Sequence, residues 1–177
     1  VKILPSITDG SGKGRMAATL ASKSKRAAHV QDIVDLVLTN GYDGIDLDYE
    51  TFAFTDGSST WSQTRPNWVA FVAELADALH AEGKLLAVTV PPMYDDDYDS
   101  SSGYWVYDYA GVGKHTDLLR IMAYDYSVGS LGPIAPLGWV EKVAAFAPTQ
   151  LPGSKVQLGI PVYGRNWFTG KTGKCPV

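Results

Sequence analysis

The segment DGIDLDYE, residues 43–50, decides the fold of this chain. Its acids alternate with apolar or aromatic residues, and a β-strand turns successive side chains to opposite faces. Asp46, Asp48 and Glu50 therefore share one face, and the residues between them share the other. A strand buried in an open parallel sheet is normally apolar on both faces. The alternation instead favours a barrel, in which one strand face lines the interior and the other packs on helices.

The rest of the chain alternates short apolar runs with amphipathic stretches. The strand-like runs are Lys2–Ile7, Gly44–Glu50, Leu85–Val90, Leu118–Ala123 and Val156–Val162. The helix-like stretches are Ala27–Thr39, Asn67–Ala81, Tyr107–Lys114 and Trp139–Phe146. Such alternation predicts a parallel sheet covered by helices, and both a doubly wound sheet and a (β/α)8 barrel fit it. A closed barrel takes about 250 residues. We therefore expect residues 1–177 to form one partial barrel domain, incomplete at both ends.

The composition is that of an ordinary globular chain, with 45% hydrophobic residues, 19% charged residues and a net charge of -4. It lacks the clustered Lys and Arg that phosphate binding needs, and no apolar run is long enough to cross a bilayer. We therefore expect a monomer with no nucleic-acid or membrane partner. The start at Val1 suggests a mature or cropped product without a signal peptide. Cys175 is the only cysteine, which excludes an internal disulfide and leaves the compartment open.

The row of acids indicates proton chemistry. Neighbouring members lie about 6.6 Å apart along a strand, and mutual repulsion with partial burial disfavours three bare anions, so at least one acid should keep its proton. Glu50 comes last, at the C-terminal mouth where barrel enzymes carry out their chemistry. A protonated Glu50 can donate to a leaving oxygen. Asp48 would then stabilise charge at the reacting carbon, and the deeper Asp46 would tune Asp48 by sharing a proton or a hydrogen bond.

Two simpler interpretations compete with this one. A solvated edge strand could carry acids by chance, but this leaves the regular apolar partners and the preceding Gly44 unexplained. Carboxylates also bind divalent metals. No histidine lies near the acids in sequence, and the strand spacing spreads their oxygens apart. We therefore expect no metal and no cofactor.

Residues 43–50 resemble the DxxDxDxE signature of family 18 glycoside hydrolases, the chitinase family. Three more segments match family elements in the right order: Lys2–Ile7 the third strand, Met122–Asp125 the sixth-strand MxYD element, and Leu158–Arg165 the seventh strand. The resemblance implies an α/β fold, a (β/α)8 TIM barrel of which this chain covers roughly strands 3 to 7. One departure is that Ser6 is not followed by the usual pair of glycines, which affects the first loop.

The same resemblance implies a retaining glycosidase acting on β-1,4-linked N-acetylglucosamine polymers by substrate-assisted catalysis. Glu50 would act as acid and then as base, and the sugar's own acetamide oxygen would be the nucleophile. Asp48, tuned by Asp46, would orient the acetamide N–H, and Tyr124 would hydrogen-bond its carbonyl oxygen. The residues implied to line the sugar subsites are Met122, Asp125, Tyr163 and Arg165.

Several alternatives stay open at this stage. Met122 fits a core position as well as a cleft, Asp125 fits a loop-fixing role, and Arg165 fits a loop ion pair. Residues 132–141 resemble a branch that includes bacterial cell-wall and spore-cortex hydrolases, so peptidoglycan remains a possible substrate, and the expected location is secreted or cell-wall associated in a bacterium. The family also contains inactive sugar-binding barrels, but these typically lose the terminal acid, which is present here as Glu50.

The loops after the second and third of these strands, Thr51–Arg65 and Pro91–Trp105, should lie at the mouth. Their aromatic rings suit the apolar faces of sugars; they are Trp61, Tyr94, Tyr98, Tyr104 and Trp105. The remaining tryptophans, Trp68, Trp139 and Trp167, are predicted to lie in the core. The acidic run at residues 95–99 lacks the Gly and Glu of a calcium-binding EF-hand loop and is predicted to be a solvated loop.

Overall fold

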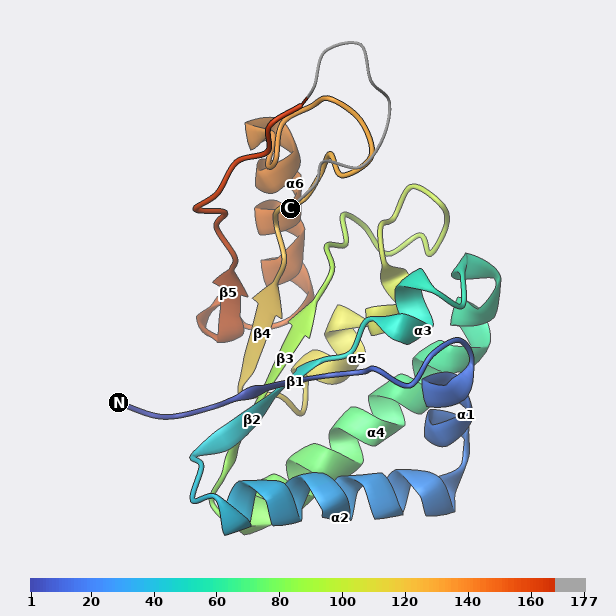
Figure 1. The fold of residues 1–177 in the computed structure, drawn as a ribbon, viewed down its shortest axis with the longest axis vertical. Coiled ribbons are helices and arrows are strands. Elements are labelled where there is room, and N and C mark those ends of the chain that lie inside the picture. Colours follow the sequence, from blue (N-terminus) through green and yellow to red (C-terminus); the bar gives the residue numbers. More distant parts are fainter. Residues whose placement is uncertain (168–177) are drawn as a thin grey trace.

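The computed structural model describes residues 1–167 and contains one parallel sheet with strand order β1-β2-β3-β4-β5 (Figure 1). The strands are β1 (Ser6–Thr8), β2 (Gly44–Asp48), β3 (Leu85–Val90), β4 (Leu118–Ile121) and β5 (Val156–Leu158). Their spatial order follows the chain order, as in a barrel, whereas a doubly wound sheet reverses its order at a switch point. The strands described do not close into a full barrel. The five predicted strands are confirmed, although four of them are shorter than predicted.

Helices connect the strands and cover one face of the sheet. They are α1 (Arg15–Ala21), α2 (Lys23–Thr39), α3 (Thr51–Phe54), α4 (Trp61–Ala81), α5 (Tyr109–Gly113) and α6 (Leu137–Gln150), with 3-10 turns at Ser58–Thr60, Trp105–Tyr107 and Gly153–Lys155. In Figure 1, α1, α2 and α4 lie together on one side of the strands, and they pack on one another. Within residues 1–167, no helix combines the length and apolarity that a membrane span needs.

The structure corrects three local predictions. Helix α1 was not predicted, because its seven residues are too few to give a clear helical period. The segment Thr51–Arg65, predicted as a loop, contains α3 and the start of α4. The stretch Tyr107–Lys114, predicted as one helix, is interrupted at Asp108. Asp108 has a φ of 46°, and its side chain accepts a hydrogen bond from the backbone N–H of Gly111, which caps α5.

The apolar face of β2 packs against helices, as the alternation predicted. Ile45 and Leu47 are fully buried. Tyr49 stacks on His29 of α2 and Phe71 of α4, with ring centroids 5.9 and 6.1 Å apart, and its hydroxyl lies 2.8 Å from Nε2 of His29. This packing fixes the rotation of β2, so the acids on its opposite face are turned away from the helices.

Gly44 begins β2 at a point of close strand contact. A Cβ at this position would overlap the backbone carbonyl oxygen of Leu85 on β3. We expect Gly44→Ala to lower the free energy of unfolding by about 1–3 kcal/mol, the usual effect of overpacking. Urea denaturation would measure the loss. Gly153→Ala is the matched control, since a Cβ there meets no atom within 4 Å, and equal stability of the two variants would contradict the prediction.

The inner face of the sheet carries a row of polar side chains, one from each strand. Ser6 lies opposite Asp46, and Thr89 lies opposite Arg120, which in turn lies opposite Gln157. We call these five residues the inner polar row. Hydrogen bonds and one ion pair link its members across the strands. The row extends from β1 to β5 directly below the acids at the strand ends.

Candidate active site

Asp48 and Glu50 lie where β2 passes into α3. Asp48 is the last residue of the strand, and Glu50 is the N-cap of α3 with φ -115° and ψ -22°. The strand was predicted to run through Glu50, so its end is two residues earlier than expected. Both acids nevertheless line one polar cavity of about 250 Å³, together with Thr8 and Asp9 from the end of β1 and the loop that follows it. Glu50 therefore reaches the mouth at the start of a helix instead of the end of a strand.

The two carboxyl groups perturb each other. Burial raises the pKa of Glu50, and the negative charge of Asp48 and a hydrogen bond with Asp48 raise it further. Burial and the charge of Asp46 raise the pKa of Asp48, while the hydrogen bond from Glu50 opposes this rise. The shared hydrogen bond thus favours the state in which Glu50 is protonated and Asp48 is ionised. One oxygen of Asp48, Oδ1, is buried without a hydrogen-bond partner among the described residues.

Asp46 has different partners from the one predicted. Its side chain is almost fully buried, and Oδ2 accepts a hydrogen bond of 2.6 Å from Ser6 and lies 2.9 Å from Nη1 of Arg120. The hydroxyl of Thr89 lies 3.0 Å from its Oδ1. These three donors come from β1, β4 and β3. Asp46 therefore influences Asp48 through its charge, and not through the direct hydrogen bond or shared proton that was expected.

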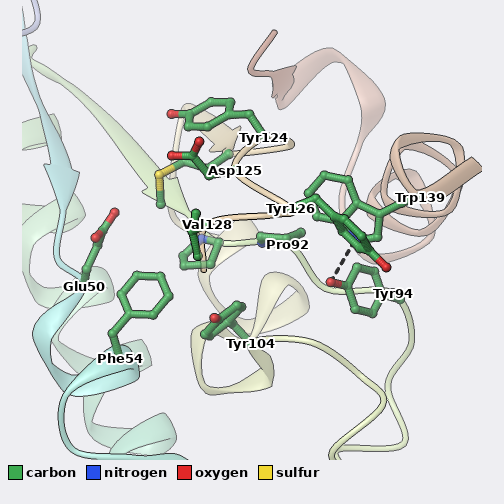
Figure 2. A pocket seen from close by; sticks show the side chains of 12 residues that line it. Glu50, Phe54, Pro92, Tyr94, Tyr104, Tyr124, Asp125, Tyr126, Val128 and Trp139 are labelled. Carbon is green, nitrogen blue, oxygen red and sulfur yellow. Dashed lines mark hydrogen bonds between the residues drawn. The ribbon is translucent and has the colours of Figure 1, made fainter. Parts of the chain in front are cut away.

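A cleft of about 400 Å³ opens beside Glu50 (Figure 2). The residues that line it are Glu50, Phe54, Pro91, Pro92, Tyr94, Tyr104, Met122, Tyr124, Asp125, Tyr126, Val128 and Trp139. Figure 2 shows Glu50 and Phe54 on one side, with Tyr94 and Trp139 across the cleft. Half of these lining residues are aromatic, and they surround the carboxyl group of Glu50, an arrangement suited to a sugar chain.

Trp139 belongs to this wall, so its prediction as a core residue is wrong. It lies in the first turn of α6, is only partly buried, and donates a hydrogen bond of 2.9 Å from Nε1 to the hydroxyl of Tyr94. The bond ties α6 to the loop after β3 (Figure 2). Trp68, by contrast, is fully buried as predicted. Trp139 lines the cleft because of how α6 packs against the loop after β3. A local sequence pattern cannot predict such a tertiary contact.

Met122, Tyr124 and Asp125 all line the cleft. On a regular strand the consecutive residues Tyr124 and Asp125 would point to opposite faces. Both line the cleft because β4 ends at Ile121 and the backbone then turns, with Asp125 at a φ of 56°. Burial, and next the negative charges of Asp48 and Glu50, raise the pKa of Tyr124. Its phenol is therefore a hydrogen-bond donor at the edge of the acid pair.

Tyr163 and Arg165 contact Asp125 and do not line the cleft. Both donate to Oδ1 of Asp125 over 2.7 Å, Tyr163 through its hydroxyl and Arg165 through Nη2. Burial opposes ionisation of Asp125, but these hydrogen bonds and the charge of Arg165 outweigh it and lower the pKa of Asp125. Tyr163 and Arg165 therefore orient Asp125, which is itself a cleft residue.

The five loop aromatics that were predicted to contact sugar rings divide into two groups. Tyr94 and Tyr104 line the cleft, whereas Trp61 packs against Tyr104 and Trp105. Tyr98 lies away from Glu50, and Cζ of the Arg65 guanidinium is 3.8 Å from the centroid of the Tyr98 ring. Sequence reasoning did not single out six of the cleft residues: Phe54, Pro91, Pro92, Tyr126, Val128 and Trp139. Phe54 follows Glu50 by four residues, one helical turn, and a prediction of α3 would have found it.

No group of three or more His, Cys, Asp or Glu side chains within residues 1–167 is arranged to hold a metal ion. In the acidic loop at residues 95–99, Asp99 instead accepts hydrogen bonds from the side chain and backbone of Ser101, which lower its pKa. Cys175 lies outside the described residues.

Residues 1–175 match the family model described as glycosyl hydrolases family 18. The chain belongs to family 18. The Bacillus subtilis protein YdhD, named as a sporulation-specific glycosylase, is 34% identical over 84% of this chain and 33% of its own length. The cortical fragment-lytic enzyme of B. subtilis is 27% identical over 78% of this chain and 30% of its own length. The chain thus spans about a third of the length of these curated relatives.

The solved structures of a sporulation glycosylase and of a chitinase superpose well on this chain. The crystal structure of YdhD gives a TM-score of 0.83 at 28% identity, covering 99% of this chain and 58% of that one. The chitinase from Chromobacterium violaceum gives 0.78 at 29% identity, covering 96% and 51%. With the family match, this confirms the predicted fold class, a partial (β/α)8 barrel.

Proposed function

We propose that this chain carries the catalytic acid and part of the sugar-binding cleft of a retaining glycosidase that cleaves β-1,4-linked N-acetylglucosamine polymers. The observation that carries the proposal is the Glu50–Asp48 pair beside an aromatic cleft, in which burial, the charge of Asp48 and the shared hydrogen bond raise the pKa of Glu50. Membership of family 18 supports the same chemistry, since that family uses the substrate's acetamide in place of a second carboxylate. Chitin and its oligosaccharides are the favoured substrates because several relatives are named chitinases.

In the proposed first step, Glu50 donates its proton to the glycosidic oxygen while the carbonyl oxygen of the 2-acetamido group attacks the anomeric carbon. The C–O bond to the leaving sugar breaks, and a cyclic oxazolinium ion forms. Glu50, now a carboxylate, then takes a proton from the water that opens this ring. The product keeps the β configuration because the anomeric carbon is inverted twice.

Asp48 and Tyr124 are suited to hold the acetamide. The buried Oδ1 of Asp48 has no protein donor among the described residues, so it can accept the acetamide N–H. The negative charge of Asp48 also stabilises the positive oxazolinium ion. Tyr124, kept protonated by its raised pKa, can donate to the acetamide oxygen. Such prearranged charges and dipoles usually contribute more to the rate than any other single effect.

The test is hydrolysis of a fluorogenic N-acetylglucosamine oligomer, with and without EDTA. We expect turnover that EDTA leaves unchanged. Tight binding of the oligomer without turnover would instead support a sugar-binding barrel, and loss of turnover on chelation would support a metal-dependent hydrolase.

We expect the activity to fall at high pH as Glu50 loses its proton. Because the pKa of Glu50 is raised, this loss should occur above the range of an ordinary glutamate. Asp48→Asn removes a negative charge that raises this pKa, so the alkaline limb of the remaining activity should move to lower pH. A pH profile of kcat/KM measures it. Asp117→Asn, remote from the cleft on the His80 ion pair, is the matched control and should leave the limb in place.

A second candidate substrate is peptidoglycan, because the B. subtilis relatives are named for sporulation and cortex lysis. Chitin and peptidoglycan both contain N-acetylglucosamine, so the same acid pair serves either substrate. Product profiles on chitin oligomers and on purified peptidoglycan would distinguish them. Release of reducing N-acetylglucosamine ends from peptidoglycan alone would favour the second candidate, which implies a secreted or cell-wall location in a bacterium.

A further inference from the structure

Gly159 follows β5 at the point where the chain leaves β4 and turns into the cleft. Its backbone N–H donates a hydrogen bond of 2.8 Å to the carbonyl oxygen of Ile121, the last residue of β4. The same oxygen accepts a hydrogen bond of 2.9 Å from the N–H of Ala123, two residues further along the chain. Gly159 is therefore attached to the turn from which Met122 and Tyr124 reach the cleft.

The ring of Tyr124 lies directly against the α-carbon of Gly159. A Cβ at position 159 would be 2.7 Å from Cε1 of Tyr124 and 3.0 Å from the carbonyl oxygen of Ile121. Carbon atoms in contact are normally about 3.5–4.0 Å apart, so a side chain here would displace the ring by about 1 Å. Gly159 is not among the glycines with a positive φ. The structure therefore requires glycine at this position for its lack of a side chain, and not for its backbone freedom.

The position of the Tyr124 ring matters because its hydroxyl belongs to the proposed site. Tyr124 lines the cleft with Glu50, and the charges of Asp48 and Glu50 raise the pKa of its phenol after burial does. In the proposed mechanism this hydroxyl donates to the acetamide oxygen of the sugar. A hydrogen bond weakens steeply as its angle departs from linearity, and a misplacement of about 1 Å can cost about 10²-fold in rate.

We propose that Gly159 is a positioning residue for catalysis: its missing side chain leaves the space that the Tyr124 ring occupies, and thereby sets where the phenol meets the acetamide. The inference rests on the proposed function for the role of Tyr124. Gly159 does not itself line the cleft beside Glu50. Its effect on the reaction is exerted through the Tyr124 ring, which Tyr163 meets edge to face from another side, with centroids 6.4 Å apart.

The experiment introduces Gly159→Ala into the unmodified protein and into Tyr124→Phe, and measures kcat, KM and urea denaturation. In the unmodified background, kcat on an N-acetylglucosamine oligomer should fall by about 10²-fold, with a smaller change in KM. Phenylalanine keeps the ring but lacks the hydroxyl. In Tyr124→Phe, the same substitution should therefore lower stability as before and add almost no further loss of kcat. A glycine needed only for folding would not show this coupling.

Gly164→Ala is the matched control, because it makes the same change in the same segment after β5, where a Cβ meets no atom within 4 Å. It should leave kcat and stability unchanged. If Gly159→Ala alone does not fold, Tyr124→Ala removes the ring, and the double variant should then fold. A double variant that also fails to fold would overturn the proposal, because the contact with Ile121 would then be the decisive one.

Two further results would overturn the proposal: an unchanged kcat in a folded Gly159→Ala, and an equal loss of kcat in the unmodified and Tyr124→Phe backgrounds. Absence of turnover in the unmodified protein would count against the proposed function instead. A crystal structure of Gly159→Ala tests the placement without any substrate. The Tyr124 ring should be displaced by about 1 Å, and an unmoved ring would refute the positioning role.

Discussion

Glu50→Gln is expected to reduce kcat/KM on N-acetylglucosamine oligomers by about 10²–10⁴, the range typical of a lost general acid. Glutamine has the size of glutamate and keeps a carbonyl acceptor, but it carries no proton that can be transferred to a leaving oxygen. Phe54 on the adjacent turn and the cleft wall opposite have no reason to move. Oligomer binding should therefore persist, and the loss should appear mainly in kcat.

The stability of the same variant separates a catalytic role from a structural one. The folded-state pKa of Glu50 is raised, so the folded protein holds this proton more tightly than the unfolded chain does. The resulting stability is fully present below the unfolded pKa and is lost as pH rises through the folded pKa. A neutral glutamine avoids this loss, so Glu50→Gln should gain stability relative to the unmodified protein at alkaline pH.

Thermal unfolding at several pH values, beside kcat/KM, completes the test. Glu82→Gln makes the same chemical change at the exposed end of α4 and should alter neither quantity. Activity of Glu50→Gln equal to that of the unmodified protein would remove Glu50 as the acid. Inactivity that accompanies a large loss of stability would point to misfolding instead.

Local sequence patterns predicted the parts of the fold that depend on the period of single elements. The alternation in residues 43–50 predicted which side of β2 faces the helices, and Tyr49 packs on His29 and Phe71 as that requires. The same pattern could not show that the strand stops at Asp48. That end depends on α3, whose four residues are too few for a periodic signal.

Contacts between distant segments were the main source of error at the site. Trp139 lines the cleft because α6 meets the loop carrying Tyr94, 45 residues earlier in the chain. Tyr163 and Arg165 contact Asp125, which adopts a positive φ after β4. The sequence does not indicate this conformation, because residues other than glycine rarely adopt it. The sequence analysis assigned no role to Arg120, because it lies within the apolar run Leu118–Ala123. A charged residue within such a run is itself a signal, since a buried strand carries a cation only where a partner meets it.

Substrates without N-acetyl groups are expected to resist cleavage if the acetamide is the nucleophile. Three acids line the cavity beside Glu50, namely Asp9, Asp48 and Glu50 itself. In the proposed mechanism Asp48 is a hydrogen-bond acceptor and charge stabiliser, Glu50 transfers the proton, and no carboxylate attacks carbon. The attacking oxygen must then come from the sugar itself. Its attack on the anomeric carbon is intramolecular, and well-oriented intramolecular reactions reach effective concentrations of about 10⁵–10⁸ M. Removing the acetyl group removes that oxygen together with the whole advantage.

Fully deacetylated chitosan oligomers make this a sharp comparison because they should still bind. Each 2-amino group can be protonated, and a cation is attracted to the negative charge of Asp48, so weak affinity would not explain a lack of turnover. We expect no measurable cleavage of the deacetylated oligomer, while it competes with the acetylated oligomer of the same length. Partly acetylated chains should be cut only where an acetylated sugar occupies the position beside Glu50, which mass spectrometry of the new reducing ends would show. Efficient cleavage after glucosamine would mean that a protein group or water attacks directly. The acetamide-holding roles proposed for Asp48 and Tyr124 would then be wrong, even if Glu50 remained the acid.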